Sequence, residues 1–273
     1  MLVRETEFAV GDLTVTQSGH VMTVTIDRPD KLNALTAKFW ADLPAVLDRL
    51  TADESVRAVI LTARGERAFC AGGDIPGFLA LDTVAAISAY QAAAMAAFRA
   101  IELAPWPVIA AVNGIALGGG CELVLACDMA IAADHARFGM PEARLGLVPG
   151  FGAVRGPEVI GRAMTRYLIA SGDSIDASQA LQAGLVQWVV SPNRLQSEAQ
   201  ELAGRIAAQS PNAIAASKRM INRNMDAEAV SQSVRDLTEL QSSADRATGV
   251  TAFLARRTPE FTTRSDGARK VLA

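Results

Sequence analysis

The stretch that most constrains the fold is PVIAAVNGIALGGGCELVLA, residues 107 to 126, in which an apolar run is followed by four glycines and one acid, Glu122. PVIAAV is typical of a strand buried on both faces. Asn113-Gly114 predicts a turn. The glycine triplet and the apolar residues that follow it, as far as Ala133, predict a buried helix. Strand, turn and helix start in this order indicate an α/β protein.

Glycines at a helix start have a chemical use, because the first N–H groups of a helix are unpaired and lie at the positive end of its dipole. A dinucleotide site is disfavoured, since residues 118 to 123 read GxGxxL and Glu122 stands where the pyrophosphate would lie. A phosphate-binding loop is disfavoured because the required lysine is missing. An oxyanion hole with Glu122 as an acid or base accounts for both features. An acid in the first helical turn also occurs simply because it complements the dipole.

Two further segments carry glycines close to an acid. ERAFCAGGDI, residues 66 to 75, follows the apolar run AVILTA and can supply another free backbone N–H before Asp74. ARFGMPEARLGLVPGFG, residues 136 to 152, places Glu142 directly after Pro141. Each segment by itself is typical of an ordinary loop or of a helix that begins with a favourable charge.

The rest of the chain divides into two parts. Up to residue 192, β-rich runs alternate with helical patterns, and from residue 194 apolar residues keep the three and four spacing of helices. We therefore expect a core with the active site over 1–192 and a helical region over 193–273, with a hinge at Ser191-Pro192-Asn193. Whether the tail adds a layer to the core or makes a subunit contact stays open. The predicted strands are 21–27, 58–63, 107–112 and 186–190, and the predicted helices include 36–50 and 83–103.

Composition narrows the functional classes. Half of the 273 residues are hydrophobic, and the formal net charge is −3 with no basic stripe, so nucleic acid is not an expected partner. We find no signal-like start and no uncharged apolar segment of eighteen residues, so we expect a cytoplasmic protein without a membrane partner. Cys70, Cys121 and Cys127 lack metal-ligand spacing, and we expect core cysteines and no metal.

The three glycine-containing segments, in this order and at these separations, resemble the enoyl-CoA hydratase/isomerase family, also called crotonases. The resemblance runs over nearly the whole chain, from IDRPDKLNALT at 26–36 to FLARR at 253–257. It implies a crotonase-like α/β spiral of repeated ββα units with a C-terminal helical region at a trimer interface, in a homotrimer or hexamer. It implies no metal or redox cofactor, and coenzyme A enters as part of an acyl-CoA thioester substrate.

The resemblance also implies roles for individual residues. The backbone N–H groups of Gly73 and Gly119 would form the oxyanion hole. Glu122 would be the principal base that orients water, and Glu142 the principal proton donor. The loop from Lys31 to Ala34 and the 71–75 turn would contact the substrate and its CoA moiety, through Lys31, Ala34, Ala71, Gly72, Asp74 and Ile75. Asp74 is interpreted more readily as support for the turn than as a catalyst.

Both family glutamates are present, which favours an enoyl-CoA hydratase that adds water to a 2-enoyl-CoA to give 3-hydroxyacyl-CoA in fatty-acid or related acyl-CoA metabolism. The alternatives are an isomerase or specialised acyl-CoA dehydratase of the same family and, more distantly, a non-catalytic or RNA-binding member. Two departures from the family's sequence pattern leave the identity of the acyl substrate open. Trp106 stands where the family often has lysine, and GFGAVRGPEVIG at 150–161 stands where many hydratases read GAGGTQRLPRLIG.

Overall fold

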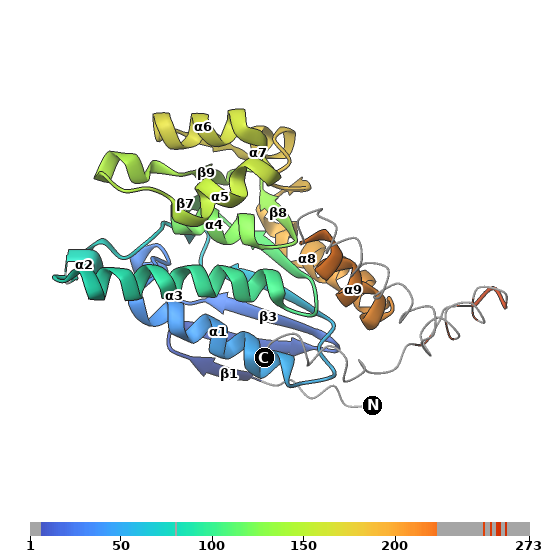
Figure 1. Ribbon diagram of the computed structural model, residues 1–273. Coiled ribbons are helices and arrows are strands. Elements are labelled where there is room, and N and C mark those ends of the chain that lie inside the picture. Colours follow the sequence, from blue (N-terminus) through green and yellow to red (C-terminus); the bar gives the residue numbers. More distant parts are fainter. Residues whose placement is uncertain are drawn as a thin grey trace, which may run out of the picture.

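The computed structural model describes residues 7–79 and 81–222, together with positions 248, 252, 255–257 and 260. These residues form two sheets (Figure 1), a larger one of order β1-β2-β3-β4-β6-β8-β11 and a smaller one of order β10-β9-β7-β5. The strands are β1 (Glu7–Val10), β2 (Leu13–Ser18), β3 (Val21–Ile26), β4 (Ala58–Ala63), β5 (Ala68–Cys70), β6 (Val108–Val112), β7 (Ile115–Leu117), β8 (Met129–Ala133), β9 (Arg137–Gly139), β10 (Ser174–Asp176) and β11 (Trp188–Val190).

The chain builds these sheets as a spiral. Three times in succession it places one strand in the larger sheet and the next strand in the smaller sheet, as β4 and β5, then β6 and β7, then β8 and β9, and a helix follows each pair. The strands β3, β4, β6, β8 and β11 pair in parallel, and so do β5, β7 and β9. The predicted spiral of ββα units is therefore confirmed.

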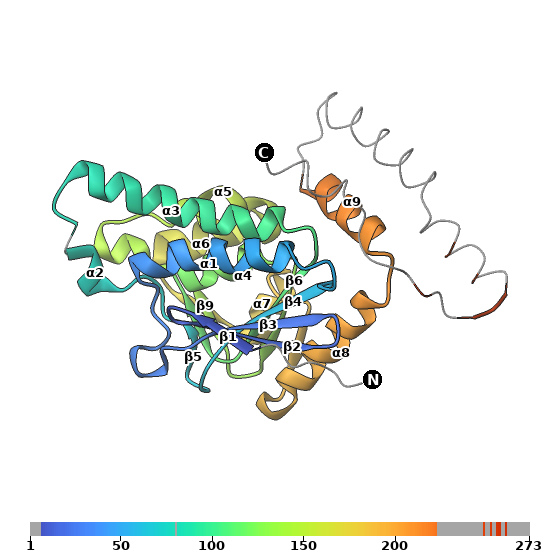
Figure 2. The ribbon, with the colours of Figure 1, turned by 90° about the horizontal axis from the view of Figure 1, so that it is seen from below.

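Helices cover both faces of the larger sheet. On one face α1 and α3 lie side by side (Figure 2) and share the main core with α4. On the other face α8 packs through Leu195, Ala199 and Leu202 onto apolar side chains that include Ile60 and Ile109. The helices are α1 (Ala37–Thr51), α2 (Ile75–Leu79), α3 (Val84–Leu103), α4 (Gly119–Ala126), α5 (Gly150–Val159), α6 (Gly161–Ser171), α7 (Ala177–Gln182), α8 (Leu195–Ala207) and α9 (Pro211–Ile221), with short 3-10 turns η1 (Pro29–Lys31), η2 (Pro141–Leu145) and η3 (Pro192–Arg194).

The helix α3 carries few charges. Among the described helices it alone has the length and mean hydropathy of a membrane span. Its Phe98 and Ile101 side chains are buried in the main core, at 2 % and 1 % exposure. The C-terminal half of α3 therefore packs in the core, although only 22 % of its apolar window is buried.

The C-terminal helical region is described only in its first part. The helix α9 begins at Pro211, and the side chain of Ser210 accepts a hydrogen bond from the N–H of Ala213 and caps the helix. The helical patterns at 229–244 and 250–257 lie outside the described residues, apart from positions 252 and 255–257. The division at residue 192 and the oligomer contact of 193–273 stay predictions.

The prediction of one helix from the glycine triplet to Ala133 is wrong. The helix α4 ends at Ala126, Cys127 is extended, and Met129–Ala133 forms β8 beside β6. Apolar runs of alanine and isoleucine suit a buried strand as well as a buried helix, so the sequence pattern could not place this boundary. The strands β5, β7 and β9 were not predicted, because three residues are too few to show a period of two. The strand predicted at 186–190 is confirmed at Trp188–Val190.

Candidate functional site

A cavity of about 770 Å³ lies where the strands β5 and β7 end. These strands are parallel neighbours, with Cys70 opposite Ala116, so the two glycine turns that follow them meet. A Cβ on Gly72 would lie 3.9 Å from the Cα of Gly118. The cavity brings together most of the predicted site residues, namely Ala71, Gly72, Gly73, Ile75, Gly119, Glu122 and Glu142.

Two backbone amides in the cavity wall are free to bind a ligand. In the described part of the chain, the N–H groups of Gly73 and Gly119 donate to no protein acceptor. The amides next to them are used, since the N–H of Asp74 donates to the carbonyl of Leu35 at 2.9 Å and that of Gly118 to a carbonyl in β9 at 2.9 Å. Gly119 is also the first residue of α4, where the helix dipole favours negative charge. Both groups can donate to a polarised carbonyl oxygen.

The glycines of the second turn are required by close packing. Gly118 has a φ of +52°, and a Cβ there would lie 2.8 Å from Oε1 of Glu142. Gly120 lies so close to Cys70 that a Cβ would come within 2.8 Å of the Cβ of that cysteine. A side chain at either position would therefore displace an acid of the site or separate the two turns.

Glu122 lies in the first turn of α4 and is 7 % exposed. Its Oε1 accepts a hydrogen bond of 2.8 Å from the N–H of Gly152 in the first turn of α5. The N-cap residue of α5 is Pro149, which supplies no side-chain cap. Burial raises the pKa of Glu122, and the N–H groups of Gly152 and Phe151 oppose that rise. Glu122 therefore caps a neighbouring helix, and this contact favours its charged form.

Glu142 follows Pro141 in η2 and is half-buried. Its Oε2 is buried and has no hydrogen-bond partner among the described residues. Burial is the main cause that raises the pKa of Glu142 to about 7, and the charge of Glu122 adds to the rise. Burial thus raises the pKa of both acids, but two neighbouring amides oppose the rise at Glu122, whereas Glu142 gains and loses its proton near neutral pH. Such a division is typical of acid and base pairs in active sites.

Three predicted residues do not line the cavity. Lys31 is exposed at the end of η1. The carbonyl of Ala34 accepts a hydrogen bond of 2.6 Å from Nη1 of Arg28, and the same nitrogen lies 3.9 Å from Oδ1 of Asp74. Ala34 and Asp74 therefore hold the turn that carries Gly73, and this contact supports the interpretation of Asp74 as turn support. The CoA contacts of all three stay predictions.

Part of the cavity wall is aromatic, and the sequence pattern did not mark most of it. Trp40 lies edge-on to Phe98 with ring centroids 5.2 Å apart, and Phe98 stacks on Phe151 at 4.7 Å. Tyr90 also lines the cavity. The helical period of 36–50 and 83–103 showed that these side chains face inward, but it does not separate a cavity wall from a filled core. Only Phe151 was singled out, as part of the departing segment.

Comparisons with known proteins agree with this geometry. The family model described as enoyl-CoA hydratase/isomerase matches residues 16–264. The chain belongs to the enoyl-CoA hydratase/isomerase family. It is 39 % identical over 252 residues to a short-chain-enoyl-CoA hydratase of Clostridium acetobutylicum, which covers 91 % of this chain and 96 % of that protein. It is 35 % identical over 256 residues to a 2,3-dehydroadipyl-CoA hydratase of Escherichia coli, covering 92 % and 99 %.

A solved structure shows the same fold. An enoyl-CoA hydratase from Bacillus anthracis matches with a TM-score of 0.87 and 34 % identity, over 92 % of this chain and 99 % of that one. Membership of the crotonase family implies an acyl-CoA thioester substrate. The two named relatives act on different acyl groups, so identity at this level does not fix the substrate of this chain.

Proposed function

We propose that this protein is an enoyl-CoA hydratase that adds water to a 2-enoyl-CoA and releases 3-hydroxyacyl-CoA. One observation carries the proposal. The two free amides of Gly73 and Gly119 line the same cavity as one buried and one half-buried carboxylate, Glu122 and Glu142. Hydration of a thioester needs both elements, because negative charge develops on the carbonyl oxygen while protons move at the neighbouring carbons.

The reaction follows from these positions. The thioester oxygen accepts hydrogen bonds from the N–H groups of Gly73 and Gly119, which stabilise the enolate-like state. Glu122 takes a proton from water as the water oxygen bonds to C3, and the C2–C3 π electrons move toward the carbonyl. Glu142 then gives its proton to C2. The product therefore gains one hydroxyl group at C3 and one hydrogen at C2. Each of the two amides lowers the activation barrier by about 3 kcal/mol.

Burial raises the pKa of both acids, and the hydrogen bonds of Glu122 to backbone amides are what support the different roles. The amides at the start of α5 favour a charged Glu122, as a base requires, and a pKa of about 7 keeps Glu142 partly protonated at neutral pH, as an acid requires. We expect kcat/KM to fall as the pH rises above about 7 and also to fall in acid, where Glu122 is protonated. Because two acids in one cavity titrate as a pair, the apparent pKa values of the profile of kcat/KM against pH belong to the pair and not to either residue.

A panel of CoA esters tests the function. Saturated, 2-enoyl and 3-enoyl CoA esters of several chain lengths are incubated with the protein in ¹⁸O-labelled water, and products are read by mass spectrometry. We expect 3-hydroxyacyl-CoA with one labelled oxygen from the 2-enoyl esters. A protein that only moves the double bond of 3-enoyl esters would be an isomerase, and one that leaves every ester unchanged would contradict the proposal. The Glu122→Gln, Glu142→Gln double variant, purified in the same way, controls for contaminating hydratases.

We also propose that the protein works as a homotrimer or hexamer. Exposed apolar side chains support this, including Trp188, Ile221 and Val154, which are 44 %, 79 % and 67 % exposed. Light scattering after size exclusion tests the proposal, and a monomeric mass would contradict it.

A further inference from the structure

We propose that the ion pair between Glu102 and Arg155 positions Glu122 for catalysis. It ties α5 to α3, so that the first N–H groups of α5 stay on the Glu122 carboxylate. Neither residue lines the cavity of about 770 Å³, and both act through the helix that carries Gly152. The effect on turnover rests on the proposed hydratase function, whereas the effect on Glu122 itself does not.

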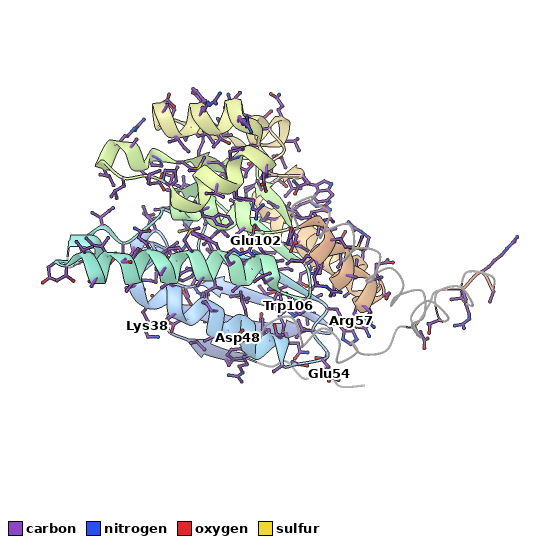
Figure 3. All side chains as sticks on the ribbon, in the orientation of Figure 1. Lys38, Asp48, Glu54, Arg57, Glu102 and Trp106 are labelled. Atoms are coloured by element: carbon purple, nitrogen blue, oxygen red, sulfur yellow. The ribbon has the colours of Figure 1, made fainter. Side chains whose placement is uncertain are left out.

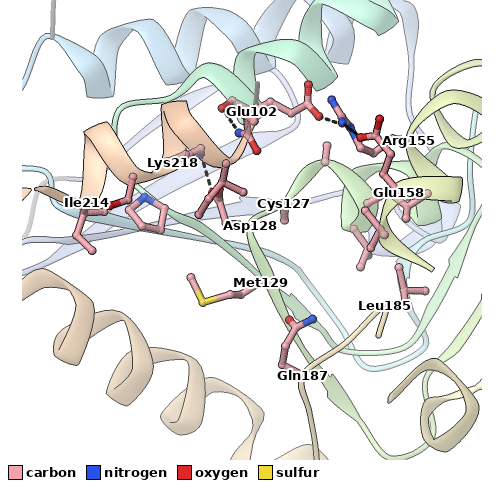
Figure 4. Close-up of a pocket in the computed structure, with 18 residues that line it drawn as sticks. Glu102, Cys127, Asp128, Met129, Arg155, Glu158, Leu185, Gln187, Ile214 and Lys218 are labelled. Atoms are coloured by element: carbon pink, nitrogen blue, oxygen red, sulfur yellow. Dashed lines mark hydrogen bonds and ion pairs between the residues drawn. The ribbon is translucent and has the colours of Figure 1, made fainter. Parts of the chain in front are cut away.

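The ion pair is short and partly buried, since the Arg155 side chain is 22 % exposed. Glu102, near the end of α3, is 6 % exposed, and its Oε1 lies 2.6 Å from Nε of Arg155. Its Oε2 lies 2.6 Å from Nη1 of Arg99 on the same helix. Arg155 also pairs with Glu158, one turn farther along α5. Figure 3 labels Glu102 on the side of α3 that faces α5, and Figure 4 shows its carboxylate meeting Arg155 across the two helices.

A second contact joins the same two helices one turn closer to the cavity. Phe98 precedes Glu102 by four residues and Phe151 precedes Arg155 by four, so each pair shares one side of its helix. The Phe98 and Phe151 rings stack with centroids 4.7 Å apart and an angle of 29° between their planes. The two helices are therefore joined at two successive turns, and Gly152 follows directly after the inner contact.

Close packing leaves α5 little freedom to adjust. A Cβ on Gly152 would lie 2.5 Å from Sδ of Met140 and 3.5 Å from Cγ of Glu122. A Cβ on Gly156, next to Arg155, would lie 2.9 Å from the side chain of Thr165. Because α5 touches a neighbour closely at both places, a displacement at Arg155 is passed to the helix start.

The other partner of the ion pair is held firmly as well. In Figure 4, α9 reaches this region through Lys218, whose Nζ donates to the carbonyls of Ile101 at 2.9 Å and Trp106 at 3.1 Å and to Oδ2 of Asp128 at 2.6 Å. Asn222 Nδ2 donates to the Glu102 carbonyl at 2.9 Å. The three donors of Lys218 are thus all used. A cavity of about 460 Å³ lies beside these residues. The charged side chains around it hold α3 in place.

Positioning and direct electrostatics make opposite predictions for the pKa of Glu122 when Glu102 is removed, and the same prediction when Arg155 is removed. Through space, loss of the Arg155 charge raises the pKa of Glu122 and loss of the Glu102 charge lowers it. If the ion pair acts by positioning α5, loss of either partner releases α5, weakens the hydrogen bond from Gly152 to Glu122 and raises the pKa of Glu122. The titratable groups that face Glu122 are Glu142 from η2, Tyr90 from α3 and Cys121 from its own helix.

The first experiment measures Glu122 without any substrate. Glutamate labelled with ¹³C at the carboxyl carbon is followed by NMR through a pH titration in the Glu142→Gln background, with circular dichroism to confirm folding. We expect the pKa of Glu122 to rise in both Glu102→Gln and Arg155→Gln. Shifts of opposite sign, or no shift in folded variants, would overturn the proposal. This result stands whether or not the protein hydrates enoyl-CoA.

The second experiment measures turnover of the best ester from the panel. We expect kcat to fall about tenfold in Glu102→Gln and Arg155→Gln, with KM changed less than about twofold, because small misplacements of catalytic groups act mainly on the chemical step. Arg155→Lys keeps a cation for Glu102 and should recover most of the rate. Arg99→Gln removes the partner of Glu102 that is not on α5, and it should retain wild-type kcat. A loss in Arg99→Gln as large as that in Arg155→Gln would overturn the proposal.

A double-variant cycle separates positioning from general damage. In the Glu122→Gln background, removing Arg155 should leave the residual rate within about twofold, because the group it positions is already neutral. A further tenfold loss in that background would show that Arg155 acts on something other than Glu122, and it would contradict the proposal.

Discussion

The proposed catalytic cavity and the anchor cluster, formed by Glu102, Arg155, Lys218 and Asp128, each contain a buried carboxylate, but the two regions stabilise its charge differently. Glu122 is 7 % exposed and Glu102 is 6 % exposed. Glu102 lies between two arginines, whereas Glu122, among the described residues, has no ion pair and relies on backbone amides. Pairing with cations satisfies a buried charge and fixes the structure around it. A buried acid without a cation keeps a raised pKa, which suits proton transfer.

The largest expected effect lies in the catalytic cavity. Glu122→Gln and Glu142→Gln should each lower kcat by about 10²–10⁴-fold, since each removes one proton-transfer group, while KM changes little. Steady-state kinetics with a 2-enoyl-CoA measures this. Glu201→Gln changes an exposed acid on α8 and serves as the control. Wild-type turnover in either cavity variant would indicate that the substituted acid has a structural role, like the charges of the anchor cluster, and no role in proton transfer.

The next effect lies in the anchor cluster and concerns stability. Lys218→Met removes the buried cation of Asp128, whose side chain is 17 % exposed, so the free energy of unfolding should fall by about 3 kcal/mol. Lys38→Met breaks an ion pair with Asp42 whose lysine side chain is 66 % exposed, and it should cost less than about 1 kcal/mol. Urea unfolding compares the two. Equal losses of unfolding free energy in the two variants would show that burial of an ion pair does not change its contribution to stability.

Gly118→Ala sharpens the comparison within the cavity. Gly118 and Gly161 have φ values of +52° and +75°, so alanine at either should cost about 1–2 kcal/mol of stability. Only at Gly118 would the new Cβ meet Glu142, at 2.8 Å, whereas Gly161 has no atom within 4 Å. We expect kcat to fall at least about tenfold in Gly118→Ala and to stay near wild type in Gly161→Ala. Equal kinetics would refute the packing role of Gly118.

The smallest effect is the cost that Glu142 imposes on folding. Its pKa of about 7 in the folded protein exceeds its ordinary value of 4.5, so its stabilising contribution is complete below about pH 4.5 and is lost as the pH rises through about 7. The unfolding free energy of Glu142→Gln minus that of wild type should therefore be larger at pH 8 than at pH 5. We expect about 1–2 kcal/mol of difference, reduced by the partial exposure of the side chain. A difference in unfolding free energy that does not vary with pH would contradict this.

The sequence predicted those features that local chemistry determines. The run PVIAAV, the helix over 36–50 and the acid Glu122 at a glycine-rich helix start are all found where they were expected. Features that depend on distant residues were not predictable. Gly152 and Glu122 are thirty residues apart, and the β-strand at Met129–Ala133 has a composition that suits a helix equally. The Glu102–Arg155 pair likewise depends on how two helices cross.

One consequence follows from the way α5 begins. Pro149 gives this helix no cap of its own, and the missing acceptor is supplied by Glu122 from another helix. The first turn of α5 and the orientation of the Glu122 carboxylate therefore depend on the same hydrogen bond. Under the proposed mechanism, a chain in which that turn has not formed also lacks an oriented base, so its turnover would report whether this part of the molecule has folded.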